Sequence, residues 1–145
     1  MKRILVVEDH APFRQVICAA LQRRAEFQTI EAADGLEAVQ MADELQPDLI
    51  LLDLNLPKMH GFEAAEQIRR LAPHARLLFM SQESSPDIVR KALSLGADGY
   101  IHKMSAVTDL LPAIDAVLAG QRFVSRTDDQ ALTSICAEHT AVSAC

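Results

Sequence analysis

The chain has 145 residues, half of them apolar, so it suits one domain with one sizeable core and leaves little room for a second. Only 4% of the residues are aromatic, so this core must be aliphatic. The formal net charge of −6 argues against a general affinity for nucleic acid, which needs a basic face, and we expect no direct nucleic-acid binding.

The sequence gives no sign of a membrane or secreted protein. No segment approaches the roughly 20 apolar residues that span a bilayer, and the first ten residues, MKRILVVEDH, turn acidic too soon for a signal peptide. Cys18, Cys136 and Cys145 are far apart and in no metal-binding spacing. We therefore expect reduced thiols in a cytoplasmic protein without a membrane partner.

Strand and helix patterns alternate through the first third of the chain. Residues 4–7 are aliphatic without a break, which predicts a strand buried on both faces. Apolar residues at spacings of three and four predict a helix over residues 13–21. Residues 27–32 form a less hydrophobic strand, placed at an edge, and a second helix follows over residues 35–45.

The same alternation continues through the middle of the chain. Residues 48–53 hold an unbroken Leu-Ile-Leu-Leu run, which predicts a central parallel strand. A third helix over residues 62–71 ends before Pro73, and residues 75–80 form a fourth strand.

The last elements are shorter. A fourth helix begins around Pro86, where an early helical proline is tolerated, and stops at Gly96. Residues 99–102 form a fifth strand, and a fifth helix ends before Gly120. Pro112 is unfavourable inside a helix beyond the first turn or two, so we expect this helix to start late.

These elements predict an α/β fold: a doubly wound, flavodoxin-like, five-stranded parallel sheet with five helices on its two faces. The strand order 2-1-3-4-5 is the common solution at this size. We assign residues 1–122 to this domain and residues 123–145 to a short C-terminal tail or truncated linker. Within that tail, only residues 131–137 resemble a weak helix.

Three carboxylates are predicted to converge. Glu8 and Asp9 end the first strand, and Asp53 ends the third. The carboxyl ends of parallel strands share one edge of the sheet, and strands one and three are neighbours in the expected order. Like charges held close together are costly without a cation, and Mg²⁺ suits a site with few carboxylates.

Other groups needed for phosphoryl chemistry lie at the same edge. Ser81 follows the fourth strand and offers a hydroxyl, and Lys103 follows the fifth and offers an ammonium group. A backbone carbonyl near Asn55 could add a metal ligand. A carboxylate nucleophile surrounded by a metal, an ammonium and a hydroxyl is equipped for in-line phosphoryl transfer.

Four segments together resemble the receiver domain of two-component response regulators: ILVVEDH, LILLDLNLPKMHG, LLFMSQE and GADGYIHK. The resemblance extends from about Lys2 to Gly120. It implies that Glu8 and Asp9 bind Mg²⁺, that Asp53 is both a Mg²⁺ ligand and the phosphoacceptor, and that Asn55 offers its backbone carbonyl to the metal.

The resemblance also implies a switch. Ser81 is the hydroxyl that turns toward the phosphoryl group, Lys103 pairs with a phosphoryl oxygen, and Tyr100 matches an aromatic residue that turns inward on activation. An aromatic ring closing a sheet edge would look the same as Tyr100. Gln82 stands where the family usually has a smaller residue, so we expect it to affect phosphorylation or hydrolysis rates.

The segment AIDAVLAGQRFVS resembles the receivers of NarL/FixJ-type transcription factors, which usually continue into a helix-turn-helix domain. About twenty residues remain here, too few and insufficiently basic for such a module. The chain is therefore either a stand-alone receiver or part of a truncated DNA-binding regulator. The implied partners are a sensor histidine kinase or phosphotransfer protein, with homodimerisation possible through the helix 4–strand 5–helix 5 face.

Two other functions are less consistent with the residues. A phosphoaspartate hydrolase usually carries a second aspartate two residues after the first, where this chain has Asn55. A flavin carrier needs a loop rich in Ser, Thr or Gly after the first strand, and the acidic loop EDHAPFR would repel its phosphate. We therefore expect a phosphoacceptor switch, whose only chemistry is self-phosphorylation and autodephosphorylation, in place of an enzyme.

Overall fold

The computed structural model describes residues 1–83 and 85–125, so the weak helix expected over residues 131–137 lies outside the described residues. The chain divides into two compact units, one over Met1–Leu77 and one from Leu78 onward. Among the described residues, no helix is long and apolar enough to cross a membrane.

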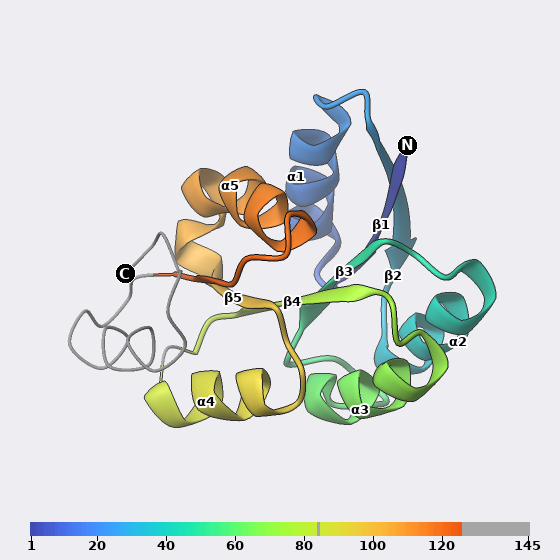
Figure 1. The fold of residues 1–145 in the computed structure, drawn as a ribbon, viewed down its shortest axis with the longest axis vertical. Helices are drawn as coiled ribbons and strands as arrows, with labels where there is room; N and C mark the ends of the chain where they lie inside the picture. Colours follow the sequence, from blue (N-terminus) through green and yellow to red (C-terminus); the bar gives the residue numbers. More distant parts are fainter. Residues whose placement is uncertain (84, 126–145) are drawn as a thin grey trace. The chain divides into compact units, whose positions relative to one another are not determined.

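The first unit contains three strands and three helices in strict alternation. Their bounds are β1 Lys2–Val7, α1 Ala11–Gln22, β2 Phe27–Ala32, α2 Gly35–Leu45, β3 Leu49–Asp53 and α3 Gly61–Leu71. β1 pairs in parallel with β2 on one side and β3 on the other, with Val7 beside both Ala32 and Leu52. In Figure 1, α1 covers one face of these strands, and α2 and α3 lie side by side on the other.

Burial explains why these sequences form these strands. Residues 4–7 and 49–52 have no exposed surface, because helices cover both faces of β1 and β3. β2 keeps exposed and half-buried positions, as expected at the edge of a sheet. The second helix begins where the sequence predicts, with the side chain of Asp34 accepting the Glu37 N–H at 2.8 Å.

The second unit contains the remaining elements. They are β4 Arg76–Ser81, whose first two residues belong to the first unit, α4 Pro86–Ser94, β5 Gly99–His102, a 3₁₀ turn at Lys103–Ser105, α5 Ala106–Leu118 and β6 Phe123–Val124. β5 pairs in parallel with β4 and β6, and Figure 1 shows α4 and α5 on opposite sides of these strands. The full strand order is β2-β1-β3-β4-β5-β6, which confirms the predicted order 2-1-3-4-5.

α5 begins at Ala106, so Pro112 is its seventh residue and lies within its first two turns. Pro112 is exposed, whereas Ala106 and Leu110 before it are buried and hold the first turns of the helix against the core. One detail differs from the sequence prediction: β6, a two-residue strand at Phe123–Val124, extends the sheet into the segment assigned to the tail.

Cys18 is a free, buried cysteine on α1. Burial, together with the charge of Glu31, raises the pKa of its thiol to about 11. Such a thiol is protonated at neutral pH and chemically inert. Cys136 and Cys145 lie outside the described residues.

The backbone at the start of α3 lies very close to the backbone at the end of β3. A Cβ atom at Gly61 would lie 2.6 Å from the Asp53 carbonyl oxygen and 2.7 Å from Leu54 Cα. The Gly61 N–H donates to the Leu54 carbonyl at 2.8 Å, which fixes this approach. Only a residue without a side chain fits here without moving the backbone that carries Asp53.

We predict that Gly61→Ala lowers the free energy of unfolding by about 1–3 kcal/mol, because the added methyl group meets backbone atoms that cannot move aside cheaply. Urea denaturation measures this change. Glu66→Ala, at an exposed position of the same helix, is the control and is expected to stay within about 0.5 kcal/mol of wild type. Equal stability of the two variants would contradict the close approach at Gly61.

Candidate functional site

Three carboxylates meet at the carboxyl end of the first unit's strands. Glu8 and Asp9 follow β1 directly, and Asp53 is the last residue of β3. Because Val7 lies beside Leu52 in the parallel register, Glu8 and Asp53 come one residue later on neighbouring strands. One carboxylate oxygen from each of the three lies within 4.8 Å of the others, which confirms the predicted convergence.

The burial of two of these three carboxylates makes their negative charge costly. Glu8 has no exposed surface and Asp53 is 2% exposed, whereas Asp9 is exposed. Backbone groups orient the two buried carboxylates: the His10 N–H donates to Glu8 Oε2 at 3.0 Å, and the Asn55 N–H donates to Asp53 Oδ1 at 3.2 Å. Hydrogen bonds offset part of the desolvation cost, and a cation is the natural means of neutralising the remainder.

The donor set fits a hard divalent cation. Carboxylate oxygens from two adjacent strand ends, with an exposed side where Asp9 lies, suit Mg²⁺, which retains several waters and uses few protein ligands. The Asn55 carbonyl as a further ligand stays a prediction.

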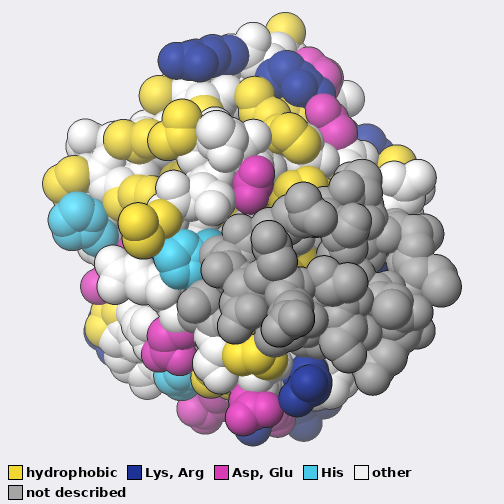
Figure 2. Space-filling model, turned by 90° about the vertical axis from the view of Figure 1, so that its left-hand side faces the viewer, with side chains coloured by type: hydrophobic (Ala, Val, Ile, Leu, Met, Phe, Trp, Pro, Cys, Tyr) yellow, Lys and Arg dark blue, Asp and Glu magenta, His cyan; other side chains and the backbone are white. Residues whose placement is uncertain are grey.

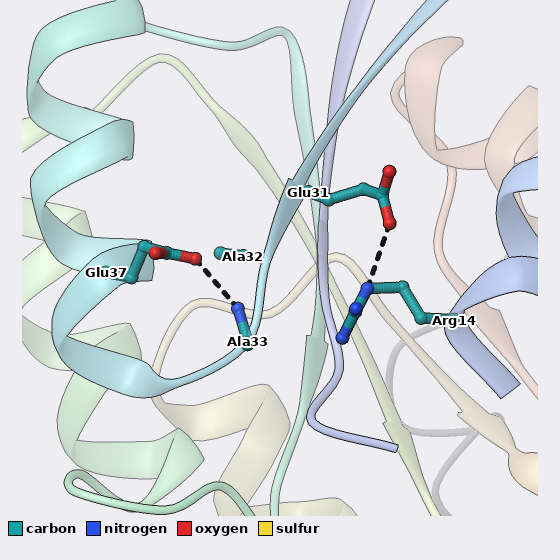
Figure 3. A pocket seen from close by; sticks show the side chains of 5 residues that line it. All are labelled: Arg14, Glu31, Ala32, Ala33 and Glu37. Atoms are coloured by element: carbon teal, nitrogen blue, oxygen red, sulfur yellow. Dashed lines mark hydrogen bonds and ion pairs between the residues drawn. The ribbon is translucent and has the colours of Figure 1, made fainter. Parts of the chain in front are cut away.

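Arg14 is a residue near this site that the sequence analysis did not single out. Its Nη1 donates to the Glu8 carbonyl at 2.6 Å, and its Nε pairs with Glu31 at 2.9 Å. Arg14 and Glu31 line an open pocket of about 260 Å³ with Ala32, Ala33 and Glu37 (Figure 3). Arg14 therefore links the end of β1 to β2; its only signal in the sequence is a basic residue within the acidic loop EDHAPFR.

The second unit places Ser81 and Lys103 at one edge of its own strands. Ser81 is the last residue of β4, is fully buried, and lies beside His102 in the parallel register. Lys103 comes next along the chain and opens the 3₁₀ turn. The Ser81 hydroxyl accepts the Glu83 N–H at 3.0 Å. Their participation in one site with the carboxylates stays a prediction.

Tyr100 and His102 are buried, at 2% and 8% exposed, so neither side chain is available to contact a partner. The Tyr100 hydroxyl donates to the Glu83 carbonyl at 2.8 Å, and His102 Nε2 lies 2.7 Å from the Gln82 carbonyl. Both side chains hold the loop after β4. Sequence analysis missed this role of His102 because a strand-end histidine has no distinctive local pattern.

Comparisons with known proteins agree with this geometry. The model of the response regulator receiver domain matches residues 4–115. Over 135 residues the chain is 34% identical to the nitrate/nitrite response regulator protein NarL of Escherichia coli strain K12, covering 92% of this chain and 61% of NarL. The chain thus spans about three fifths of the length of the curated relatives it matches.

Solved structures are similar over nearly the whole chain. A two-component response regulator of the LuxR family from Aurantimonas sp. SI85-9A1 matches with a TM-score of 0.83 and 34% identity, covering 96% of this chain and 98% of that one. A CheY-like receiver domain protein from Methanospirillum hungatei JF-1 matches with a TM-score of 0.77 and 29% identity, covering 83% and 96%. CheY has the flavodoxin-like strand order, so these matches confirm the predicted fold. The chain belongs to the response regulator receiver domain family.

Proposed function

We propose that this receiver accepts a phosphoryl group on Asp53 from a sensor histidine kinase or phosphotransfer protein in the cytoplasm. The observation that carries the proposal is the position of Asp53, at the end of β3 and within 4.8 Å of oxygens from Glu8 and Asp9. A nearly buried carboxylate beside two others is a poor surface group and a suitable nucleophile for a metal-assisted reaction.

In the proposed reaction, an Asp53 carboxylate oxygen attacks phosphorus. The new O–P bond forms as the P–N bond to the donor's histidine breaks, and the imidazole nitrogen leaves with the electron pair and takes up a proton. Mg²⁺ bound by Glu8, Asp9, Asp53 and the Asn55 carbonyl would neutralise charge on the transferring oxygens. Water later hydrolyses the acyl phosphate, which regenerates the Asp53 carboxylate and releases inorganic phosphate.

Ser81 and Lys103 complete the proposed site. A hydroxyl that accepts one hydrogen bond keeps its own proton for donation, so Ser81 can donate to a phosphoryl oxygen while it accepts the Glu83 N–H. Lys103 would pair with a second phosphoryl oxygen. The support is positional: Ser81 ends β4 and Lys103 follows the end of the neighbouring parallel strand β5, where ligands of such folds bind. The exposed side chain of Gln82 would influence water access and so the phosphoryl lifetime.

The proposed output is a changed protein-interaction surface formed by α4, β5 and α5, used for homodimerisation or for docking a partner. Arg90 and Lys91 on α4 are exposed, and Met104 and Val107 before and within α5 are 87% and 89% exposed. Figure 2 shows this side of the molecule, with hydrophobic side chains at the surface at the level of α5. Inward placement of Tyr100, as found here, would be favoured by phosphorylation.

A second candidate is the receiver part of a longer DNA-binding regulator. The observation that favours it is the match to transcriptional regulators of which this chain spans about three fifths. The same site chemistry would then control an attached output domain.

We predict that Asp53→Asn abolishes phosphoryl incorporation from acetyl phosphate with Mg²⁺, because the amide is not a nucleophile. Intact-mass measurement detects the added phosphoryl group. Asp43→Asn, at an exposed position on α2, is the matched control and should be modified like wild type. Equal modification of Asp53→Asn and wild type would remove Asp53 from the proposed role.

We predict that Asp9→Ala weakens Mg²⁺ binding by roughly tenfold or more, since it removes one carboxylate of a small ligand set. Glu8→Gln should have a smaller effect, because the amide keeps a neutral oxygen that can still bind the metal. Calorimetric titration compares both with Asp43→Ala. Wild-type affinity in Asp9→Ala would show that the metal binds elsewhere.

We predict that beryllofluoride with Mg²⁺, a mimic of the phosphoryl group, changes hydrogen exchange across residues 85–111 of the full chain. The reason is that new contacts at Ser81 and Lys103 draw on the loops after β4 and β5. Asp53→Asn, treated identically, should show no change. Unaltered protection in fully modified wild type would refute an output through this surface.

A further inference from the structure

A series of hydrogen bonds runs through the second unit from the loop after β4 to the residue after β6. His102 Nε2 lies 2.7 Å from the Gln82 carbonyl, and the His102 N–H donates to Ser125 Oγ at 3.1 Å. Ser125 Oγ donates in turn to Asp109 Oδ2 on α5 at 2.8 Å. The series therefore joins the loop that carries Ser81 to the point where the chain leaves the sheet.

The contacts of His102 define its protonation. A carbonyl oxygen only accepts, so Nε2 must carry a proton and donate to Gln82. Nδ1 accepts the Met104 N–H at 3.3 Å, so it carries no proton. The ring is therefore the neutral Nε2–H tautomer, assigned from its hydrogen-bond partners. Each ring nitrogen has a defined partner, so a residue of different reach or polarity would break at least one contact.

Both ends of the series are anchored. At the loop, His102 and Tyr100 lie two residues apart on β5, so they point to the same side and hold the successive carbonyls of Gln82 and Glu83. At the exit, Ser125 is 2% exposed and its N–H donates to the Tyr100 carbonyl at 2.9 Å. Hydrogen bonds thus connect the Ser81 loop to Ser125 through β5.

We propose that His102 is a positioning residue that couples the Ser81 loop to Ser125, the residue that follows β6, so that loss of either hydrogen bond weakens phosphoryl binding. This inference rests on the proposed function of Asp53 and Ser81. In the observed arrangement Ser81 accepts the Glu83 N–H and keeps its proton for a phosphoryl oxygen. The His102 contact stabilises this competent arrangement, and linkage makes the coupling reciprocal.

The test measures the affinity of beryllofluoride with Mg²⁺ for the full chain by calorimetry. His102→Asn retains an acceptor near the Met104 N–H but is too short to reach the Gln82 carbonyl, whereas His102→Gln restores a donor at about the position of Nε2. Ser125→Ala removes the link at the exit. Ser94→Ala, at an exposed position of α4, is the matched serine control.

We expect His102→Asn and Ser125→Ala each to weaken beryllofluoride binding by roughly threefold to tenfold, the effect of losing one neutral hydrogen bond. The double variant should be no weaker than His102→Asn alone, because both substitutions interrupt one series. His102→Gln and Ser94→Ala should bind like wild type. Tyr100 is the only tyrosine in a chain without tryptophan, so its fluorescence reports the loop directly in every variant.

Three results would overturn the inference. The first is that Ser125→Ala binds beryllofluoride like Ser94→Ala. The second is that the losses of affinity from His102→Asn and Ser125→Ala add in the double variant. The third is that His102→Gln fails to recover affinity while its Tyr100 fluorescence matches wild type. If His102→Asn does not fold, His102→Leu takes its place in the cycle. Failure of wild type to bind beryllofluoride, or binding by Asp53→Asn, would instead refute the proposed function.

Discussion

The mutual repulsion of three carboxylates at the ends of β1 and β3 is the constraint on which the functional part of the structure depends. Two of them, Glu8 and Asp53, are almost fully removed from water, where like charges interact strongly. Backbone N–H groups of His10 and Asn55 orient these carboxylates. Gly61 lets α3 approach the end of β3 closely, and its N–H donates to the Leu54 carbonyl. A site built in this way responds strongly to any added charge, which is the physical requirement for a phosphoryl switch.

The position of this trio was predictable because each carboxylate follows an aliphatic run without alternation. Residues 4–7 and 49–52 are apolar on both faces, which requires a covered parallel sheet, and parallel strands bring their carboxyl ends to one edge. The edge character of β2 followed from its mixed polarity. The strand order did not follow from these local patterns, because alternation alone is compatible with other orders; it came from the commonest arrangement of such folds.

Features that depend on contacts between residues far apart in the chain were not predictable from the sequence. The residue at which α5 begins depends on the burial of Ala106, which is a tertiary contact. β6 has two residues, which is too short for any periodicity to show. The bond between the His102 N–H and Ser125 Oγ joins residues 23 apart, and it exists only because β5 and β6 pair in a particular register. No window of neighbouring residues contains that information.

The loop after β4 is held through its backbone carbonyls, so the side chain of Gln82 and its carbonyl have separate roles. Tyr100 and His102 bind the carbonyls of Glu83 and Gln82, so these two hydrogen bonds do not depend on the side chains of the loop. The influence proposed for the exposed Gln82 side chain therefore involves different atoms from the proposed coupling, which uses the Gln82 carbonyl and the backbone N–H of His102. Under these two proposals, substitution of the Gln82 side chain alters phosphoryl lifetime and leaves the hydrogen bond from His102 in place, whereas substitution of His102 removes that hydrogen bond.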